Sequence, residues 1–369
     1  MKINTDIKYT LDDLRILPKY SPVPSRADVD TSAILFTKSN VNFKLQLPMI
    51  SSPMPTVTEH LMMAFMAKYG GLGILHRFKS IEWTEKEIYA AKAKYAELDQ
   101  IKTPLFGAAI GVNGDYLERL KMIIDTNLVK VICIDIAHGH HALMEKAIKQ
   151  VLNIIPNDVH LMAGNVATCD GAQFLFDLGI DSIRVGIGSG SACSTQIQTG
   201  CGAPLAYSIQ EALKAKLKYT YMSPDNQSLI NKKTIIADGG IKNSGDIVKS
   251  IALGSDFVMC GSLFAGTKAS PGEIIKDSQG RWGKPYKGAA SSESQKAAGK
   301  KKIRAEGVSS ITPYTGRIES VLEELKDGIQ SGCSYVGALN FQQLKENAEF
   351  IIVSEKAHYE GTPHILSRN

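Results

Sequence analysis

The fold is decided by the stretch Thr234-Ile235-Ile236-Ala237-Asp238-Gly239-Gly240-Ile241, in which an apolar run ends in a carboxylate and two glycines. The run Thr234–Asp238 is apolar on both faces, as a strand of a parallel sheet must be. The same pattern of an apolar run with a polar or glycine-rich end recurs along the chain. The other predicted strands are Leu47–Ser52, Leu72–His76, Leu105–Ile110, Lys130–Asp135, His160–Asn165, Ser182–Gly188 and Phe257–Gly261.

Segments with helical periodicity lie between these strands, for example Tyr116–Asp125, Ala142–Ile154 and Gly245–Leu253. About eight strand–helix alternations predict a (β/α)8 TIM barrel, and the alternative is a doubly wound open sheet. The polar tails favour the barrel, because they all converge on one mouth there, whereas an open sheet gathers only those near its switch point. We therefore expect residues 1–369 to form a single barrel domain.

Three segments do not fit the repeat. Residues 1–46 precede the first strand, and we expect them to cover the barrel or to contact a neighbouring subunit. Tyr219–Lys233 is a polar insertion. The range 277–313 is rich in Gly, Ser and Lys and follows the last strand, so we predict a mobile flap at the C-terminal mouth. The alternative for this range is a disordered surface loop.

Composition excludes several classes of protein. Hydrophobic residues make up 44% and charged residues 21% of the 369 residues, which is typical of a globular chain. The net charge of +5 is too small to indicate a nucleic-acid partner, although it suits an anionic small molecule. The six cysteines form no C-x-x-C pair, and no apolar run is long enough for a membrane span. We expect a cytoplasmic chain with free thiols and no contact with a membrane.

The segment Gly186–Thr195 reads Gly-Ile-Gly-Ser-Gly-Ser-Ala-Cys-Ser-Thr and follows a predicted strand. Alternating glycines let the backbone turn tightly and expose its N–H and C=O groups to a ligand or ion. Cys193 lies at the tip of this loop, where backbone N–H groups can stabilise a nucleophilic thiolate. The sequence therefore predicts a catalytic cysteine, with an ordinary structural cysteine as the alternative.

Two more strand ends indicate a nucleotide. Asp238-Gly239-Gly240 and Gly261-Ser262 follow the seventh and eighth strands, where barrels commonly bind phosphate. Asp238 is a candidate acceptor for ribose hydroxyls, and its alternative role is a helix N-cap. The three histidines in 138–141 lie too close together for a zinc site, so we expect no metal there.

These segments resemble the IMP dehydrogenase / GMP reductase family. The resemblance extends over nearly the whole chain from about Asp12, and its most specific part is the cysteine loop. It implies a (β/α)8 barrel, usually a homotetramer, in which the loop cysteine attacks purine C2. The dehydrogenase of the family oxidises IMP with NAD and hydrolyses the covalent intermediate. The reductase deaminates GMP and reduces it to IMP with NADPH.

The resemblance also separates the two activities. The dehydrogenase usually carries a CBS pair after the second strand, and Ser80–Thr103 is too short for one. Dehydrogenases carry an Arg-Tyr pair on the flap that activates the hydrolytic water, and none lies between Tyr286 and Glu306. The missing pair favours GMP reductase activity: reductive deamination of GMP to IMP and ammonia with NADPH, in purine salvage. Two stretches outside the flap, 52–59 and 360–364, instead resemble the dehydrogenase.

Two alternatives therefore stay open. The first is an IMP dehydrogenase without CBS modules, and the second is a non-catalytic nucleotide-binding barrel. The loop departs from the family at two positions, because Ser189 replaces the usual proline and Gln196 the usual arginine. The substitution at Gln196 puts that position's role beside the ion loop in doubt.

The resemblance implies a role for each site residue. Cys193 is the nucleophile, and Thr195 and Glu306 relay a proton to the leaving amine. The residues implied to hold the nucleotide are Ser191, Asp238, Gly239, Gly240, Gly261, Ser262, Ser291 and Gly307. Those implied to face NADPH are Arg77, Asp135, Ile136, Ala137, Ile187 and Gly188, with Ser25 and Arg26 from a neighbouring subunit. The carbonyl groups of Gly188, Gly190 and Cys193 are implied to hold a potassium ion.

Overall fold

The computed structural model describes residues 3–39, 41–99, 101–222, 229–288 and 307–361. Its centre is a closed barrel of eight parallel strands, ordered β12-β13-β4-β5-β6-β7-β8-β9. The barrel strands are β4 (Met49–Ser51), β5 (Leu72–Leu75), β6 (Phe106–Ile110), β7 (Val129–Asp135), β8 (His160–Val166), β9 (Ser182–Val185), β12 (Thr234–Asp238) and β13 (Phe257–Cys260). All eight strands lie where the sequence predicts them, so the (β/α)8 fold is confirmed.

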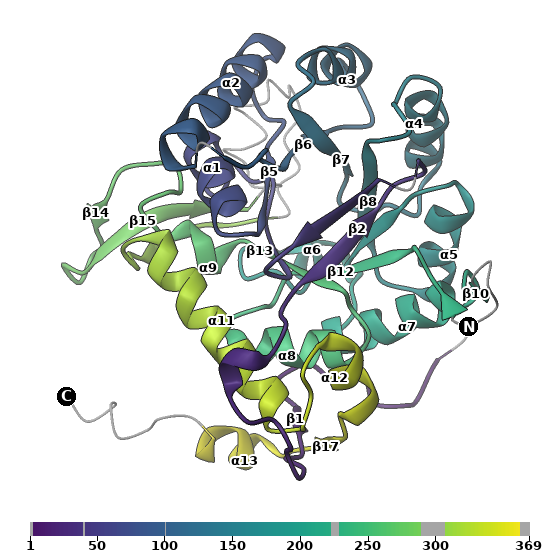
Figure 1. Ribbon diagram of the computed structural model, residues 1–369, viewed down its shortest axis with the longest axis vertical. Coiled ribbons are helices and arrows are strands. Elements are labelled where there is room, and N and C mark those ends of the chain that lie inside the picture. The colour runs from purple at the N-terminus through teal and green to yellow at the C-terminus, as the bar shows by residue number, and fades with distance from the viewer. Residues whose placement is uncertain (1–2, 40, 100, 223–228, 289–306, 362–369) are drawn as a thin grey trace.

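A helix follows each barrel strand, and the helices form an outer ring around the barrel (Figure 1). They are α1 (His60–Lys68), α2 (Ile81–Leu98), α3 (Tyr116–Asp125), α4 (Ala142–Leu152), α5 (Cys169–Asp177), α7 (Leu205–Leu217), α8 (Ser244–Ala252) and α11 (Ile318–Ser334). Polar side chains fix where several begin: Ser80 accepts a backbone N–H of α2, Thr168 one of α5 and Asn243 one of α8. These caps fix where α2, α5 and α8 begin.

An antiparallel hairpin closes the end of the barrel at which the strands begin, called the lower end below; the mouth at the carboxyl ends of the strands is the upper end. It consists of β2 (Ala33–Phe36) and β3 (Asn42–Leu45), and it crosses the centre of the helix ring in Figure 1. Leu35 and Leu45 are buried against inward-facing barrel residues such as Ile74. The expectation that the N-terminal segment covers the barrel is confirmed for this hairpin.

His160 fastens the hairpin to the barrel from below. Its Nδ1 lies 2.6 Å from the carbonyl oxygen of Phe36, and its Nε2 lies 2.7 Å from Oγ of Ser182. A carbonyl only accepts, so Nδ1 carries the proton and Nε2 accepts from the serine hydroxyl. Burial lowers the pKa of His160, although Asp181 and the Phe36 carbonyl oppose this effect. The imidazole is therefore a neutral, doubly bonded part of the structure.

Smaller elements decorate the barrel. The strands β1 (Leu14–Ile16) and β17 (Phe350–Ile352) pair next to α12 (Phe341–Asn347) and α13 (Glu355–Glu360). Within the predicted insertion, β10 (Tyr221–Met222) pairs with β11 (Leu229–Ile230). No helix in the described part of the chain has the length and apolar character to cross a membrane.

The segment predicted as a flap is partly a sheet. The strands β14 (Ile275–Lys276), β15 (Trp282–Lys287) and β16 (Ser309–Pro313) form an antiparallel sheet that projects from the barrel (Figure 1). A loop over the whole range 277–313 was therefore the wrong prediction for its two ends, because cross-strand pairing such as Tyr286 with Ser310 organises them. Residues 289–306 lie outside the described ranges, so the flap itself stays a prediction.

Candidate active site

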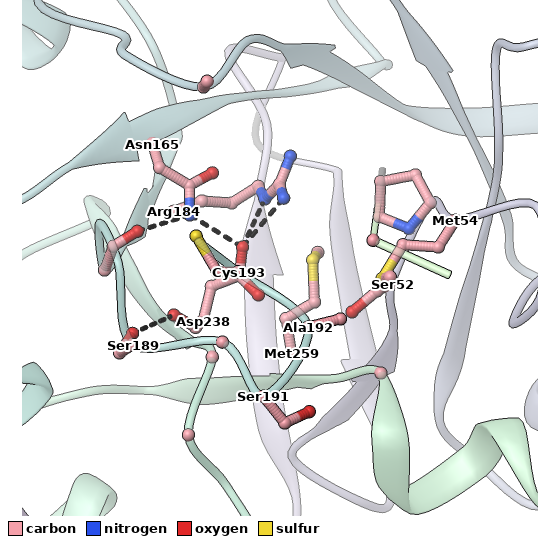
Figure 2. Close-up of a pocket in the computed structure, with 18 of the residues that line it drawn as sticks. Ser52, Met54, Asn165, Arg184, Ser189, Ser191, Ala192, Cys193, Asp238 and Met259 are labelled. Carbon is pink, nitrogen blue, oxygen red and sulfur yellow. Dashed lines mark hydrogen bonds and ion pairs between the residues drawn. The ribbon is translucent and has the colours of Figure 1, made fainter. Parts of the chain in front are cut away.

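A cavity of about 450 Å³ opens at the carboxyl ends of the barrel strands. Strand tails and the loops that follow them line this cavity, so the predicted convergence on one mouth is confirmed. Of the predicted site residues, the cavity is lined by Cys193, Thr195, Ser191, Asp238, Gly239, Gly240, Gly261, Ser262, Arg77, Asp135, Ile136, Ala137, Ile187, Gly188 and Gly190. Figure 2 shows Cys193, on the loop after β9, close to Arg184 on β9 and Asp238 on β12.

The cysteine loop leaves β9 through Gly186, a position that requires glycine. Gly186 has a φ of 137°, and a Cβ on it would lie 2.1 Å from the carbonyl oxygen of Asp238. Glycine thus lets the loop pass directly over the end of β12. The tip closes through a 2.9 Å hydrogen bond from the Cys193 N–H to the Gly190 carbonyl. The exposed Cys193 thiol donates to Oγ1 of Thr195 at 3.1 Å, so nucleophile and predicted relay are in contact.

Backbone contacts join the cysteine loop to Gly307 and Val308, and Val308 in turn to Gly288. Cys193 forms an antiparallel bridge with Gly307, and the Val308 N–H donates to the Ala192 carbonyl at 2.9 Å. The Gly288 N–H donates to the Val308 carbonyl at 3.1 Å. Gly307 therefore lies beside Cys193, and its predicted role in holding the nucleotide stays a prediction. The predicted residues Glu306 and Ser291 lie outside the described ranges.

Beneath the cysteine, a buried arginine links two carboxylates. Arg184 on β9 donates from Nη1 to Asp135 at 2.5 Å, and from Nε and Nη2 to Asp238 at 3.1 and 2.8 Å. Arg77 donates to the other oxygen of Asp135 at 3.2 Å. Asn165 donates to Asp238 at 2.8 Å, as Figure 2 shows. The carboxylate of Asp238 is thus held in the cavity wall and does not cap a helix.

The network keeps the Asp135 carboxylate charged. Burial alone raises the pKa of Asp135, but Arg184 and Arg77 outweigh it and hold that pKa below its ordinary value. Burial likewise acts to lower the pKa of Arg184, and Asp238 and Asp135 more than compensate. Two arginines and two aspartates make the set neutral overall, which is how buried charge is tolerated. The cavity therefore offers two fixed anionic acceptors to ligand hydroxyls.

One half of the cavity is lined by glycines and hydroxyl groups. Gly239 and Gly240 have φ angles of 95° and 77°, and Ser262 begins the short helix α9 (Ser262–Ala265). Ser191 hydrogen-bonds the hydroxyl of Tyr286, whose pKa is raised by burial. A Cβ on Gly261 would lie 2.7 Å from that hydroxyl, so glycine leaves room for the tyrosine. Backbone and hydroxyl donors thus surround this half, as an anionic group requires.

The other half carries Arg77, Asp135, Ile136 and Ala137. The Arg77 guanidinium lies 4.8 Å from the centre of the Phe78 ring, which holds it at the rim. The predicted residues Ser25 and Arg26 are not in this cavity. Arg26 donates to Ser331 at 3.0 Å on α11 and lies over Tyr335, so a role at a neighbouring subunit's cavity stays a prediction.

The candidate cation loop supplies backbone oxygens. The Gly188 carbonyl accepts from the Gln196 amide at 3.0 Å, and the Gly190 carbonyl accepts from Cys193. Each carbonyl has a second lone pair, so both fit a cation that prefers carbonyl ligands. Within the described ranges, no three His, Cys, Asp or Glu side chains are arranged to hold a metal ion. Nδ1 of His141 instead accepts the Leu143 N–H and caps α4.

Four further residues line this cavity that the sequence did not predict: Arg184, Asn165, Ser189 and Tyr286. One signal was readable, because Arg184 is a charged residue inside an apolar strand and needs a buried partner. Ser189 had no such signal; its hydroxyl lies 3.4 Å from the Asp238 carbonyl and ties the loop to β12. Its contact depends on the loop path rather than on local sequence.

Comparison with known proteins assigns the chain to a family. The profile described as the IMP dehydrogenase / GMP reductase domain matches residues 8–364. The chain belongs to this family. It is 34% identical to a protein named inosine-5'-monophosphate dehydrogenase from Borreliella burgdorferi, in an alignment that covers 96% of each chain.

Two further relatives of the family carry the same name. The protein from Nitrosopumilus maritimus is 29% identical over 96% of this chain and 98% of its own length. The protein from Streptococcus pyogenes is 38% identical over 80% of this chain but only 58% of its own length. Members of this family are oxidoreductases that act on the purine nucleotides IMP or GMP. In general they use NAD or NADP and a monovalent cation.

Proposed function

We propose that this protein is an IMP dehydrogenase without CBS modules, which converts IMP, NAD and water to XMP and reduced NAD. The observation that carries the covalent step is the exposed Cys193 thiol at the cavity, in contact with Thr195. The direction of the reaction is supported by relatives named IMP dehydrogenase, one of which aligns with this chain over 96% of its own length. The absence of a CBS pair therefore does not argue against the dehydrogenase.

In this proposal, the Cys193 thiolate adds to C2 of IMP and hydride leaves C2, which gives a thioimidate on the cysteine. Bound NAD supplies the hydride acceptor. Water then adds to C2, and the thiolate is expelled as XMP forms. Thr195 and Glu306 take the proton of that water, which replaces the base that the missing Arg-Tyr pair would supply.

The two halves of the cavity divide the ligands in this proposal. Asp238 accepts hydrogen bonds from the ribose hydroxyls of the nucleotide. The phosphate of the nucleotide lies against Gly240, Gly261 and Ser262. Arg77 and Asp135 face the dinucleotide. The carbonyl groups of the cysteine loop hold potassium, and a homotetramer brings Ser25 and Arg26 to a neighbouring cavity. All six cysteines are free, which suits the reducing cytosol.

A specific observation keeps GMP reductase as a second candidate. The sequence 287–305 contains no tyrosine and no Arg-Tyr pair, so the hydrolytic half-reaction lacks its usual base. The same cysteine then attacks C2 of GMP, ammonia leaves with a proton from Thr195 and Glu306, and NADPH delivers hydride to C2. IMP leaves as the thiolate returns. Both candidates share the thioimidate and differ in what attacks it.

Absorbance of the reduced cofactor decides between them. With IMP and NAD, we expect the reduced cofactor to form; with GMP and NADPH, we expect no consumption. Consumption in the second mixture alone would replace the proposal by GMP reductase. No change in either mixture, with measurable IMP binding, would point to the non-catalytic barrel instead.

A further inference from the structure

The side chain of Arg184 crosses from one strand over the next. Strand register places Asp135, Gly164 and Arg184 in one row across β7, β8 and β9. A Cβ on Gly164 would lie 2.5 Å from Cβ of Arg184, so the middle position of the row must be glycine. The missing side chain opens the path by which Arg184 reaches Asp135, two strands away.

Arg184 is shared between the two halves of the cavity. Nη1 binds Asp135 on the dinucleotide side. Nε and Nη2 bind Asp238 on the nucleotide side, as Figure 2 shows. The bonds to Asp238 from Arg184 and from Asn165 all fall on Oδ2. A ribose hydroxyl can then bind Oδ1, and in doing so it fixes the plane of the carboxylate and of the guanidinium behind it.

The contact is rigid because its members are buried. The side chains of Arg184, Asp135 and Asp238 are only 8%, 12% and 12% exposed, so solvent does not screen their mutual attraction as it would at the surface. Movement of either carboxylate must therefore move the guanidinium or break a buried ion pair. The planar fork of arginine can serve two acids at once, which the single ammonium of lysine does not reproduce.

We propose that Arg184 is a positioning residue that couples the two ligands, so that binding of the nucleotide at Asp238 strengthens binding of the dinucleotide at Asp135. The first ligand orders the shared guanidinium, and the second ligand meets a carboxylate that is already ordered. The coupling must be reciprocal, because it is a difference in binding free energy. This inference rests on the proposed division of the cavity between the two ligands.

The test uses the full chain with Cys193→Ala, which blocks chemistry and lets IMP and NAD bind together. The dissociation constant of IMP is measured by calorimetry without NAD and with saturating NAD, and that of NAD with and without IMP. We expect each ligand to tighten the other by the same factor, about fivefold or more. Adding Arg184→Lys should bring that factor close to one.

Arg77→Lys is the matched control. Arg77 pairs with Asp135 alone among the carboxylates of the described residues, so its substitution should weaken NAD binding and leave the coupling factor intact. Asp135→Asn provides a second break in the same bridge if Arg184→Lys fails to fold, as judged by circular dichroism. It should remove the coupling while IMP still binds.

The outcomes separate this proposal from the proposed function. A factor of one in the Cys193→Ala protein, or a full factor in the Arg184→Lys and Asp135→Asn variants, would overturn the coupling. Coupled binding with no turnover of IMP and NAD by the unsubstituted protein would overturn the proposed function alone. If that protein turns over GMP and NADPH instead, the same titrations are run with GMP and NADP.

Discussion

The two ends of the barrel differ in the kinds of residue that line them. At the upper end, strand tails carry glycines, two acids and two arginines around a cavity of about 450 Å³. At the lower end, the β2–β3 hairpin fills the barrel with Leu35 and Leu45, and the buried polar group His160 has both ring nitrogens satisfied. The upper end leaves acceptors and a thiol open to a ligand.

Stability and chemistry are therefore separated along the barrel axis, as in other barrels of this class. A substitution at the upper end should change turnover with little effect on folding. A substitution at the lower end should change the free energy of unfolding and leave the folded enzyme active. The following changes test that separation.

Cys193→Ala should have the largest effect. Removing the nucleophile leaves no route to the thioimidate, so we expect turnover to fall by roughly 10⁴-fold or more. Nucleotide binding and the thermal midpoint should stay close to those of the unsubstituted protein. The control is Cys201→Ala, because Cys201 is an exposed thiol in the same loop region and should not matter. Equal losses in the two variants would contradict the assignment of the nucleophile.

Leu35→Ala at the lower end should destabilise the protein by about 2–5 kcal/mol, since Leu35 is fully buried in the barrel interior. Urea unfolding followed by circular dichroism measures this loss, and turnover per folded molecule should be retained. Ile34→Ala on the same strand is the control, because Ile34 is 39% exposed and should cost less than about 1 kcal/mol. A matching loss of turnover in Leu35→Ala would break the proposed separation.

Gly288→Ala tests the upper end without replacing any of the predicted catalytic side chains. A Cβ there would lie 2.9 Å from the Ala192 carbonyl and 3.1 Å from Cα of Gly307, so it should push the cysteine loop away from its neighbours. A displacement of about 1 Å at a reacting group costs on the order of 10²-fold in rate, and we expect a loss of that size in kcat.

The control for Gly288 is Gly280→Ala at the tip of the projecting sheet. Gly280 has a φ of 75° and open space around it, so the change strains the backbone locally by about 1–2 kcal/mol but should leave kcat unchanged. Normal alkylation of Cys193 by iodoacetamide and normal kcat in Gly288→Ala would contradict the idea that Gly288 helps to position the cysteine.

The smallest expected effect comes from His160, which should make the free energy of unfolding depend on pH. Burial lowers the pKa of this histidine below its ordinary value of 6.5, so the unfolded chain binds the proton more readily. Its contribution to stability is therefore complete above about pH 6.5 and declines as the pH falls from there, by at most ~1.4 kcal/mol per pH unit. Urea unfolding at pH 7.5 and 5.5 measures the decline.

His160→Gln removes the titrating group and should make unfolding less sensitive to pH over the same range. His60 titrates in the opposite sense, because its hydrogen bond to Glu87 raises its pKa and its contribution is lost as pH rises. It is unchanged in the variant, so the comparison isolates His160. An unaltered pH dependence in His160→Gln would show that this histidine does not contribute.

The barrel and most of its mouth were readable from sequence because both depend on local pattern. Apolar runs such as Thr234–Asp238 form strands, and their tails must meet once the barrel closes. The helix α11 was not among the predicted helices, because it lies beyond the polar segment that separates it from β13. The hairpin β2–β3 was expected only as a cover, since its partners are distant in the chain.

The site residues that escaped prediction are those whose partners come from other strands. Arg184 reaches Asp135 only because Gly164 leaves space in the row between them, and strand register is not visible in sequence. Residues 289–306 lie outside the described ranges, so the roles of Glu306 and Ser291 stay predictions.

The central claim is that Cys193 carries the purine as a covalent intermediate, and mass spectrometry tests it most directly. The enzyme is quenched with acid during turnover of IMP and NAD, digested, and searched for nucleotide adducts on its cysteine peptides. If Cys193 is the nucleophile, we expect a purine nucleotide adduct on the peptide that contains Cys193 and none on the peptides of the other five cysteines. Steady turnover with unmodified Cys193, or an adduct on another cysteine, would contradict it.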